Sequence, residues 1–177
     1  MIKLSVIIPI YNAEIYIETC LLSLFEQSLL ESEFEVILIN DGSTDQSDSV
    51  IKTFAKKHSN IKIIEQTNQG VAIARNKGIQ LASGKYILFT DADDFISPNT
   101  LSTLLSEAIK NNVDILRGNY QYIDENNVVK NKKTTRITSA LCHKILDHTI
   151  FYRQICNHEF FSCLLLIKAE FLKKSKV

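Results

Sequence analysis

The run LSVIIPI at Leu4–Ile10 decides the fold class of this chain. It is almost continuously apolar and rich in Val and Ile, as is typical of a strand that is buried on both faces of a parallel sheet. A polar break at Tyr11 and Asn12 follows, and apolar residues then recur at helical spacing from about Glu14 to Ser28. The N-terminal segment therefore predicts a strand, a polar loop and an amphipathic helix.

The same alternation continues along the chain. Further strands are expected at residues 34–39, 61–64, 86–90 and 113–116, and further helices at residues 50–55, 71–82 and 97–109. We expect Gly84 to cap the helix at 71–82, and Ser97 with Pro98 to begin the next helix. Four strand–helix alternations in a row predict right-handed crossovers, and hence an α/β fold whose mainly parallel sheet carries helices on both sides.

The composition is that of one globular domain. The chain has 177 residues, 45% of them hydrophobic, with 5 Gly and 2 Pro, which excludes disordered and collagen-like classes. No apolar run reaches about 18 residues and the N-terminus lacks the features of a secretory signal, so we expect a cytoplasmic protein without a transmembrane helix. The cysteines, at positions 20, 142, 156 and 163, include no CxxC pair. We therefore expect reduced thiols rather than a zinc site.

The net charge of zero conceals an uneven distribution. Residues 1–99 carry 8 Lys or Arg and 13 Asp or Glu, a balance of −5, whereas residues 100–177 carry 12 and 7, a balance of +5. The acidic part suits a site for a divalent cation, and the basic part suits an anionic partner. Ordinary solvated surfaces give the same distribution, so both interpretations stay open at this point.

The pattern is less regular after residue 118. Residues 120–123 and 127–137 flank the turn-like segment 124–126 and suggest a hairpin, and residues 139–151 suggest a helix. A basic cluster lies on the expected hairpin, made of Lys130, Lys132, Lys133 and Arg136. It is either a charged edge that resists strand pairing or a contact for phosphate, a polyanion or a membrane. A peripheral membrane association therefore remains an alternative to a purely cytoplasmic location.

Polar side chains follow three of the expected strands, where ligands bind in open α/β sheets. They lie at residues 11–12 (YN), 40–43 (NDGS) and 91–94 (DADD). The last is the strongest feature, because three carboxylates within four residues repel one another and are easiest to keep ionised around a cation. Oxygen ligands at a strand end, with alternate positions on one side, suit Mg²⁺ or Mn²⁺ shared with substrate phosphates. An acidic turn that caps the following helix is the alternative.

Other phosphate-binding classes fit less well. No G-x-G-x-x-G follows the first strand, which argues against a dinucleotide-binding dehydrogenase. The segment from Gly78 to Lys85 differs from a P-loop in its glycine spacing, and a strand follows it where a P-loop requires a helix. A phosphatase of the haloacid dehalogenase type, with Asp91 as nucleophile, is an alternative, although Asp94 and Phe95 depart from that family's pattern. We expect no nucleic-acid partner.

The ordered set of motifs resembles the family 2 glycosyltransferases, which are nucleotide-sugar-dependent, inverting enzymes with the GT-A fold. The resemblance spans about residues 3–124, through residues 4–12 (LSVIIPIYN), 40–45 (NDGSTD), 68–76 (NQG and ARN) and 84–94 (GKY and DADD). It implies a Rossmann-like, mainly parallel sheet flanked by helices, with the nucleotide-sugar-binding core at residues 1–124. Residues 125–177 would be the less regular start of an acceptor-side region, which we expect to be truncated.

The resemblance also implies roles for individual residues. It implies a nucleotide pocket formed by Pro9, Tyr11, Asn12, Glu14, Asp41, Arg75, Asp91 and Ala92. Within it, Tyr11 would stack on the base and Asp41 would accept a hydrogen bond from a uracil ring nitrogen. Arg75 would approach the base or the diphosphate, and Asp91 would hold the ribose. Asp93 would bind the Mn²⁺ or Mg²⁺ ion that bridges the two phosphates.

The implied reaction is transfer of a sugar from a UDP-linked donor to a hydroxyl of a saccharide or lipid-linked acceptor, with inversion, in the synthesis of cell-surface polysaccharide or glycan. The general base of this family is typically an Asp in an acidic pair that follows a segment like Phe160–Lys174, and no such pair follows here. Glu159 is the best candidate within the chain, and we assign no catalytic base. A nucleotide-sugar-binding module or fragment without turnover is the alternative.

Overall fold

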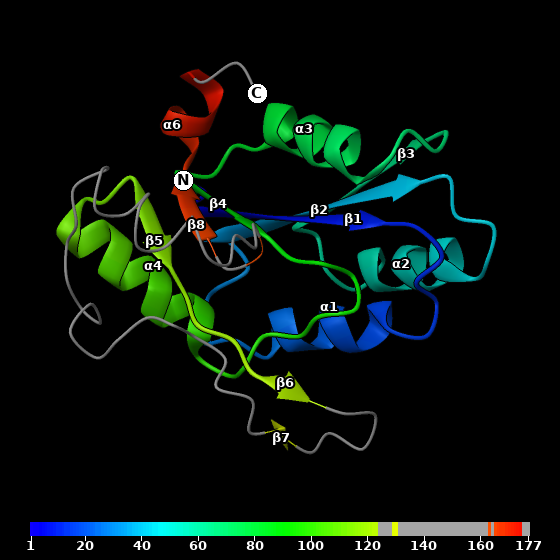
Figure 1. Cartoon of the computed structure of the whole chain (residues 1–177), viewed down its shortest axis with the longest axis horizontal. Helices are drawn as coiled ribbons and strands as arrows, with labels where there is room; N and C mark the ends of the chain where they lie inside the picture. The colour runs from blue at the N-terminus through cyan, green and yellow to red at the C-terminus, as the bar shows by residue number, and fades with distance from the viewer. Residues whose placement is uncertain (124–128, 131–162, 164, 175–177) are drawn as a thin grey trace.

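The computed structural model describes residues 1–123, 129–130, 163 and 165–174. The strands of its main sheet are β1 Leu4–Ile10, β2 Phe34–Asp41, β3 Ile61–Gln66, β4 Tyr86–Phe89, β5 Ile115–Arg117 and β8 Leu165–Lys168. They form a six-stranded sheet in the order β3-β2-β1-β4-β8-β5 (Figure 1). β3, β2, β1 and β4 run parallel, whereas β8 is antiparallel to both of its neighbours, β4 and β5. The mostly parallel sheet confirms the predicted α/β class.

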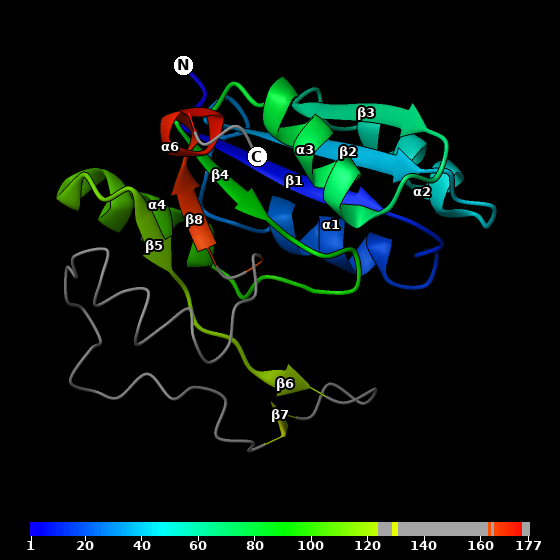
Figure 2. The same ribbon diagram turned by 45° about the horizontal axis from the view of Figure 1, so that its top comes forward.

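Helices cover both faces of this sheet, as predicted (Figures 1 and 2). The described helices are α1 Ile17–Phe25, α2 Ser47–Ala55, α3 Val71–Leu81, α4 Thr100–Asn111 and α6 Ala169–Lys174. α1, α2 and α4 pack on one face, where Ile17 and Leu21 of α1 join Val6 and Ile8 of β1 in one core cluster. α3 and α6 cover the other face, around Ile7 of β1. β1 therefore buries side chains on both faces, which explains its almost continuously apolar sequence.

The strand β8 is absent from the sequence prediction. It pairs with β4 through Leu88 and Leu166, and with β5 through Leu116 and the same Leu166. Figure 2 shows β8 between these two strands. Its short apolar run has strand character, but its partners lie far away in the sequence, so periodicity alone does not reveal where it pairs.

The predicted cap of α3 was wrong. Ala82, in an extended conformation, occupies the C-cap position that was expected for Gly84. Gly84 instead passes so close to β1 that an added Cβ would lie 2.6 Å from the carbonyl carbon of Leu4. Its N–H donates to Ser5 Oγ at 2.9 Å. This glycine is therefore explained by the close approach of two backbone segments rather than by the end of a helix.

The predicted start of α4 was also wrong. Asn99 adopts a left-handed conformation with φ 62°, which interrupts the chain between Pro98 and the helix. α4 consequently begins at Thr100, whose N–H donates to the Ser97 carbonyl at 3.2 Å. Ser97 and Pro98 therefore form a turn before the helix instead of its N-cap and first residue.

The region after β5 contains a short antiparallel pair, in agreement with the expected hairpin. β6 (Tyr122–Ile123) pairs with β7 (Val129–Lys130). The turn at 124–126, the cluster residues at 132, 133 and 136, the helix expected at 139–151 and the candidate base at 159 lie outside the described residues. In the described part of the chain, no helix combines the length and the apolar character needed to span a membrane.

Candidate functional site

The parallel strands carry the predicted site residues to one edge of the sheet. The loop after β1 begins at Tyr11, β2 ends at Asp41, the loop after β3 contains Gly70, and the loop after β4 contains Asp91. Because β1 to β4 are parallel, their carboxyl ends lie at the same edge, where open α/β sheets bind ligands. We refer to this edge as the candidate site.

The loop after β1 is tied to the loop after β2 by hydrogen bonds. Asn12, which has a positive φ of 50°, donates its N–H to Ser43 Oγ at 3.2 Å and accepts the Thr44 N–H at its Oδ1 at 2.8 Å. Glu14 Oε2 accepts the Gln46 N–H at 2.7 Å. Asn12 and Glu14, which the resemblance assigns to a nucleotide pocket, therefore hold the loops after β1 and β2 together.

Asp41 is buried, and its carboxylate holds the loop that precedes α3. Oδ1 accepts from Gln66 Nε2 and from the Gln69 N–H, both at 2.8 Å, and Oδ2 accepts from the Gly70 N–H at 2.9 Å. Burial opposes ionisation, but these donors outweigh it and lower the pKa of Asp41 below its usual value. The Asp41 carboxylate is therefore a pure acceptor at neutral pH.

Arg75 of α3 forms an ion pair with Asp91. Its Nη2 lies 2.5 Å from Asp91 Oδ1, and the two side chains are 24% and 38% exposed. The guanidinium carbon also lies 6.0 Å from the centre of the Phe89 ring. Arg75 Nε is buried and has no hydrogen-bond partner among the described residues. Because an unpaired buried donor is costly, this N–H is suited to donate a hydrogen bond to a ligand oxygen.

The acidic segment after β4 forms a turn rather than an extended strand end. β4 ends at Phe89, and the Asp94 N–H donates to the Asp91 carbonyl at 3.1 Å. The strand-like alternation that the sequence suggested for Asp91 and Asp93 therefore does not apply, because the turn brings together residues three positions apart. Asp93 is exposed, at the tip of this turn.

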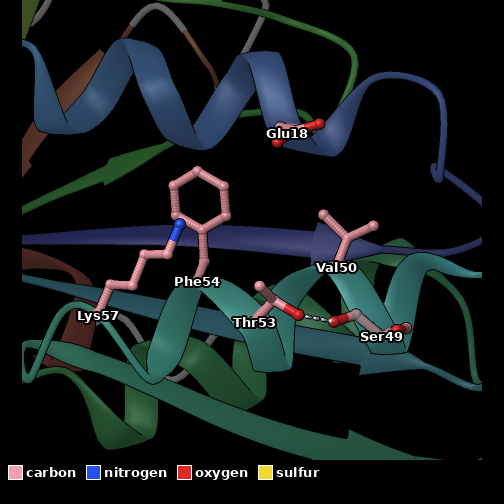
Figure 3. Close-up of a pocket in the computed structure, with 6 residues that line it drawn as sticks. All are labelled: Glu18, Ser49, Val50, Thr53, Phe54 and Lys57. Atoms are coloured by element: carbon pink, nitrogen blue, oxygen red, sulfur yellow. Dashed lines mark hydrogen bonds between the residues drawn. The ribbon is translucent and has the colours of Figure 1, made fainter.

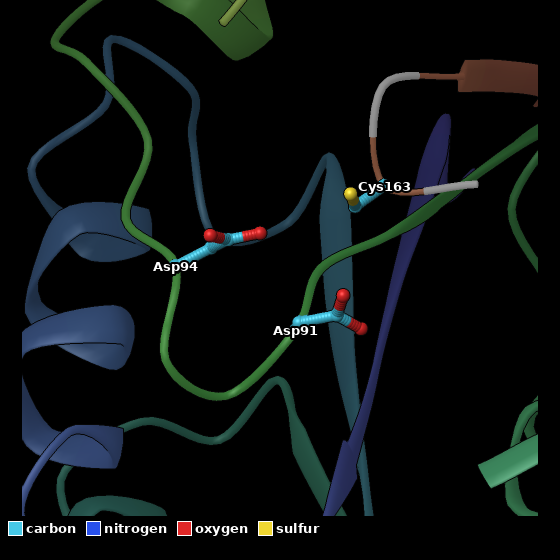
Figure 4. A group of neighbouring side chains, drawn as sticks. All are labelled: Asp91, Asp94 and Cys163. Carbon is cyan, nitrogen blue, oxygen red and sulfur yellow. The ribbon is translucent and has the colours of Figure 1, made fainter. Parts of the chain in front are cut away.

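A cysteine completes a group with two of these carboxylates. The ligand atoms of Asp91, Asp94 and Cys163 all lie within 4.8 Å of one another, and Figure 4 shows the thiol facing the two carboxylates from the segment that leads into β8. Asp93 is not part of this group. On the other side, Cys20 of α1 directs its thiol to the Asp91 carbonyl at 3.6 Å.

Burial and the acidic turn together raise the pKa of three neighbouring groups. Burial, and then repulsion by Asp91 and Asp93, raises the pKa of Asp94, although a hydrogen bond from Cys163 acts in the opposite direction. Burial and the neighbouring carboxylates Asp91 and Asp94 raise the pKa of Cys163 to about 11. Burial and the same acidic turn raise the pKa of Cys20 to about 12. The turn thus holds more negative charge than its surroundings neutralise.

The sequence predicted most of the residues at this edge, including Pro9, Tyr11 and Ala92, but it did not reveal two further features. Pro9 is half-buried at the end of β1, Tyr11 is 53% exposed beside it, and Ala92 is buried in the acidic turn. The motif NQG at residues 68–70 was noticed, but not that its amides bind a buried carboxylate. No spacing signal pointed to Cys163, because only the pairing of β8 brings it to the acidic turn.

A groove between α1 and α2 lies apart from the candidate site. It has a volume of about 180 Å³ and is lined by Glu18, Ser49, Val50, Thr53, Phe54 and Lys57. Figure 3 shows Phe54 and Val50 pointing from α2 toward α1, which carries Glu18. None of the residues predicted to bind the donor or the metal lines this groove.

Comparison with known proteins identifies relatives over most of the chain. The protein is 43% identical over 117 residues to an uncharacterized glycosyltransferase, YibD, of Escherichia coli K12, which covers 66% of this chain and 33% of the relative. It is 37% identical over 130 residues to a poly(ribitol-phosphate) beta-glucosyltransferase of Bacillus spizizenii, covering 72% of this chain and 20% of the relative. The chain therefore matches a third or less of the length of these two relatives.

Solved structures share the fold. Staphylococcus aureus TarS 1–349 in complex with UDP-GlcNAc matches 99% of this chain with a TM-score of 0.79 and 27% identity, and the match covers 48% of that chain. A mannosyltransferase from Pyrobaculum calidifontis, PcManGT, in complex with GDP-Man and Mn²⁺ matches 66% of this chain with a TM-score of 0.61 and 28% identity, and the match covers 35% of that chain. These matches confirm the GT-A architecture that the motifs implied.

The family model named Glycosyl transferase family 2 matches residues 5–169, which include every motif at the carboxyl edge of the sheet as well as Cys163 and β8. With the fold and the relatives in agreement, the chain belongs to the family 2 glycosyltransferases.

Proposed function

We propose that this chain forms the donor-binding part of a glycosyltransferase that moves a sugar from a UDP-linked donor to an acceptor hydroxyl. The observation that carries the proposal is the match over 99% of the chain to a structure that holds UDP-GlcNAc. The family match favours a transferase over both the phosphatase and the non-catalytic module that the sequence left open.

The base of the donor would lie against the loops after β1 and β2. Tyr11 is 53% exposed and offers a ring face on which a base can stack. Asp41 Oδ2 accepts one hydrogen bond in this structure, so it retains capacity for the imide N–H of uracil. This contact does not require Asp41 to release the loop before α3. Pro9, Asn12 and Glu14 would shape the pocket around the base.

The ribose and the diphosphate would lie toward α3 and the acidic turn. Asp91 Oδ1 is paired with Arg75, which leaves Oδ2 to accept from a ribose hydroxyl beside the buried Ala92. The unpartnered Arg75 Nε would donate to a phosphate oxygen. These contacts are proposed from the resemblance and from the open hydrogen-bonding capacity of the two side chains.

Mn²⁺ or Mg²⁺ is the proposed cofactor, and the residues of the acidic turn fit it. Asp93 and Asp94 offer hard oxygen ligands beside Asp91, and Asp94 forms no ion pair with any described residue. Asp93, which is exposed, is the proposed ligand on the side that faces the diphosphate. When bound, the cation would offset the negative charge that develops on the departing diphosphate.

The proposed reaction is a single displacement with inversion. The acceptor oxygen forms a bond to the anomeric carbon while the bond between that carbon and the diphosphate oxygen breaks, and the acceptor proton passes to a general base. We assign this base to no described residue. A saccharide or lipid-linked acceptor of cell-surface polysaccharide synthesis is proposed, supported by the relative named for poly(ribitol-phosphate) glucosylation.

Thermal unfolding of the chain tests donor binding. A ligand at about 100 times its Kd stabilises a folded protein by about 2.7 kcal/mol. For a chain of this length we expect UDP with Mn²⁺ to raise the Tm by about 5 to 10 °C. Asp93→Ala should remove the part of this rise that depends on Mn²⁺, since the proposed ligand is lost.

Asp114→Ala is the matched control, because Asp114 is an exposed aspartate just before β5 and does not belong to the acidic turn. It should retain the full rise. A wild-type Tm that does not respond to UDP with Mn²⁺, or that responds more to GDP, would contradict the proposed donor. An Mn²⁺-dependent rise that survives Asp93→Ala would contradict the assigned ligand.

A further inference from the structure

Polar side chains of α1 and of the turn after it hold the segment that connects β4 to α4. Figures 1 and 2 show this connecting segment, residues 90–99, passing along α1 on its way to α4. Cys20, Ser23 and Gln27 contact it, at spacings of three and four residues, and they are only 1%, 8% and 9% exposed. A buried helix face is normally apolar. Because buried polar groups are stable when they are hydrogen-bonded, the contacts of these residues reveal what the polar face does.

Gln27 joins α1 to the end of the connecting segment and to the first turn of α4. Its Oε1 accepts the Leu101 N–H at 3.1 Å, and its Nε2 donates to the Ser97 carbonyl at 3.1 Å. The same Nε2 donates to the Ser23 carbonyl at 2.8 Å, within its own helix. One side-chain amide therefore supplies both the acceptor and the donor that the backbone needs where it leaves the loop and enters α4.

Ser23 holds the middle of the connecting segment. Its hydroxyl donates to the Cys20 carbonyl at 2.7 Å and accepts the Ile96 N–H at 3.0 Å. Because the hydroxyl proton is used inside the helix, the oxygen faces the loop as an acceptor. Cys20 adds a weaker contact, from its thiol to the Asp91 carbonyl at 3.6 Å. The polar face of α1 thus contacts the backbone of the loop both at the acidic turn and just after it.

The acidic turn lies between two backbone contacts. Before it, the Thr90 N–H donates to the Ile7 carbonyl at 3.1 Å, and after it the Ile96 N–H donates to the serine hydroxyl. Asp93 and Asp94 are exposed and carry charge of the same sign, so packing of their side chains does not fix where the carboxylates lie. The backbone contacts on both sides fix them instead. Ligand groups have to be held within about 0.5 Å of their productive positions, which makes these contacts relevant to the site.

We propose that Ser23 and Gln27 are positioning residues for the cation site. The inference rests on the proposed function, because the acidic turn is the proposed site of Mn²⁺ or Mg²⁺. Both side chains would act on the backbone that follows the turn, without touching the ion or the donor. Without them, the carboxylates would move apart, as their mutual repulsion favours. Groups that hold metal ligands in place are commonly worth about 10- to 100-fold in affinity, and we expect the lower end because these two act through the backbone.

Amide hydrogen exchange of the chain without any ligand tests whether α1 holds the turn. Gln27→Met retains the length of the side chain but removes its donor and its acceptor, and Ser23→Ala removes the acceptor of the Ile96 N–H. In both variants we expect the amides of residues 91–97 to exchange about tenfold faster, because the segment opens locally more often. The amides of β3, which make no contact with these side chains, should exchange at the wild-type rate.

Tyr86→Phe is the matched control. The Tyr86 hydroxyl is buried and donates to the carbonyls of Ala108 and Val113, and the residue begins β4, at the opposite end from the acidic turn. Loss of this donor should also lower the stability of the fold, because two buried acceptors lose their partner. It should leave the exchange of residues 91–97 unchanged. Urea denaturation of every variant measures its stability and verifies that it is folded.

Titration calorimetry with UDP and Mn²⁺ tests the consequence for the site. Gln27→Met and Ser23→Ala should each raise the Kd for UDP about tenfold, whereas Tyr86→Phe should change it by less than about twofold. A purely structural role would lower the unfolding free energy of all three variants without separating their affinities. The comparison of affinity at similar stability therefore distinguishes positioning from a general loss of stability.

The outcomes separate this inference from the proposed function. Unchanged exchange of residues 91–97 in Gln27→Met and Ser23→Ala overturns the inference. Faster exchange with unchanged UDP affinity overturns it as well, and so does an equal loss of affinity in Tyr86→Phe. Faster exchange together with a selective loss of affinity supports it. A wild-type chain that does not bind UDP with Mn²⁺ contradicts the proposed function, and the exchange rates still decide whether α1 holds the turn.

Discussion

Two carboxylates at opposite ends of the sheet have opposite surroundings. Glu35, near the start of β2, accepts hydrogen bonds from Ser5 Oγ at 2.6 Å, Lys62 Nζ at 2.7 Å and the Ser83 N–H at 2.7 Å. Burial disfavours its charge, but these donors outweigh burial and lower its pKa to about 2. Asp94, after β4, is exposed, yet desolvation and the neighbouring carboxylates Asp91 and Asp93 raise its pKa.

The difference distinguishes a structural charge from a charge that awaits a ligand. At the amino end of the strands, the protein supplies both the cation and the hydrogen-bond donors that Glu35 needs. At the carboxyl end, Asp94 has neighbours of its own sign and a thiol. Excess negative charge at a strand end is therefore a better sign of a binding site than burial of a carboxylate as such.

The largest effect is expected from removal of the structural carboxylate. Glu35→Ala leaves the buried Ser5 hydroxyl and the Ser83 amide without their acceptor, and we expect the free energy of unfolding to fall by about 3 to 5 kcal/mol. Urea denaturation at pH 7 measures this change. Glu33→Ala is the control, because Glu33 forms an exposed ion pair with Lys3 at the same end of β2, and its effect should be far smaller.

The pH dependence of stability should depend on the same residue. Because the pKa of Glu35 is lowered from 4.5 to about 2, its contribution to stability is complete above pH 4.5 and is lost as the pH falls toward 2. A shift of this size corresponds to about 3 kcal/mol. Denaturation curves of the wild type and of Glu35→Gln should therefore converge between pH 4.5 and 2. Curves that stay parallel over this range would contradict the role assigned to Glu35.

The smallest effect is expected at the binding end, and it has the opposite sign. Because the pKa of Asp94 is raised, the carboxylate contributes stability at low pH that is lost as the pH rises through its folded-state pKa. Asp94→Asn should therefore raise the free energy of unfolding at pH 7 without metal, by less than about 1 kcal/mol because solvent screens the turn. A lower free energy of unfolding in Asp94→Asn would contradict the inference that the charge of Asp94, unlike that of Glu35, destabilises the folded protein.

The parts of the fold that the sequence predicts are those with local signals. β1 reveals itself through an apolar run, and α3 through the helical spacing of its residues, since both depend on near neighbours along the chain. β8 does not, because its place between β4 and β5 is decided by partners far away in the sequence. The first residue of α4 is Thr100 and not the predicted Pro98, because Asn99 adopts a left-handed conformation. The Ser-Pro motif gives no sign of this conformation.

The sequence likewise predicted some features of the candidate site and not others. The motifs located Asp41, the last residue of β2, and Asp91, which lies just after β4. They did not reveal that Asp41 holds the amides of Gln69 and Gly70, nor that a turn pairs Asp91 with Asp94. Both arrangements depend on backbone conformation after the strand ends, where side-chain alternation no longer applies.

The insertion of β8 also orders events during synthesis. Its contact with β4 joins residues about 80 positions apart, as in the pair Tyr86 and Lys168. A ribosome adds about 5 to 20 residues per second, so β8 is synthesised on the order of ten seconds after β4. During that interval one edge of β4 is an open template for another strand, and the nascent chain is then most exposed to mispairing and aggregation.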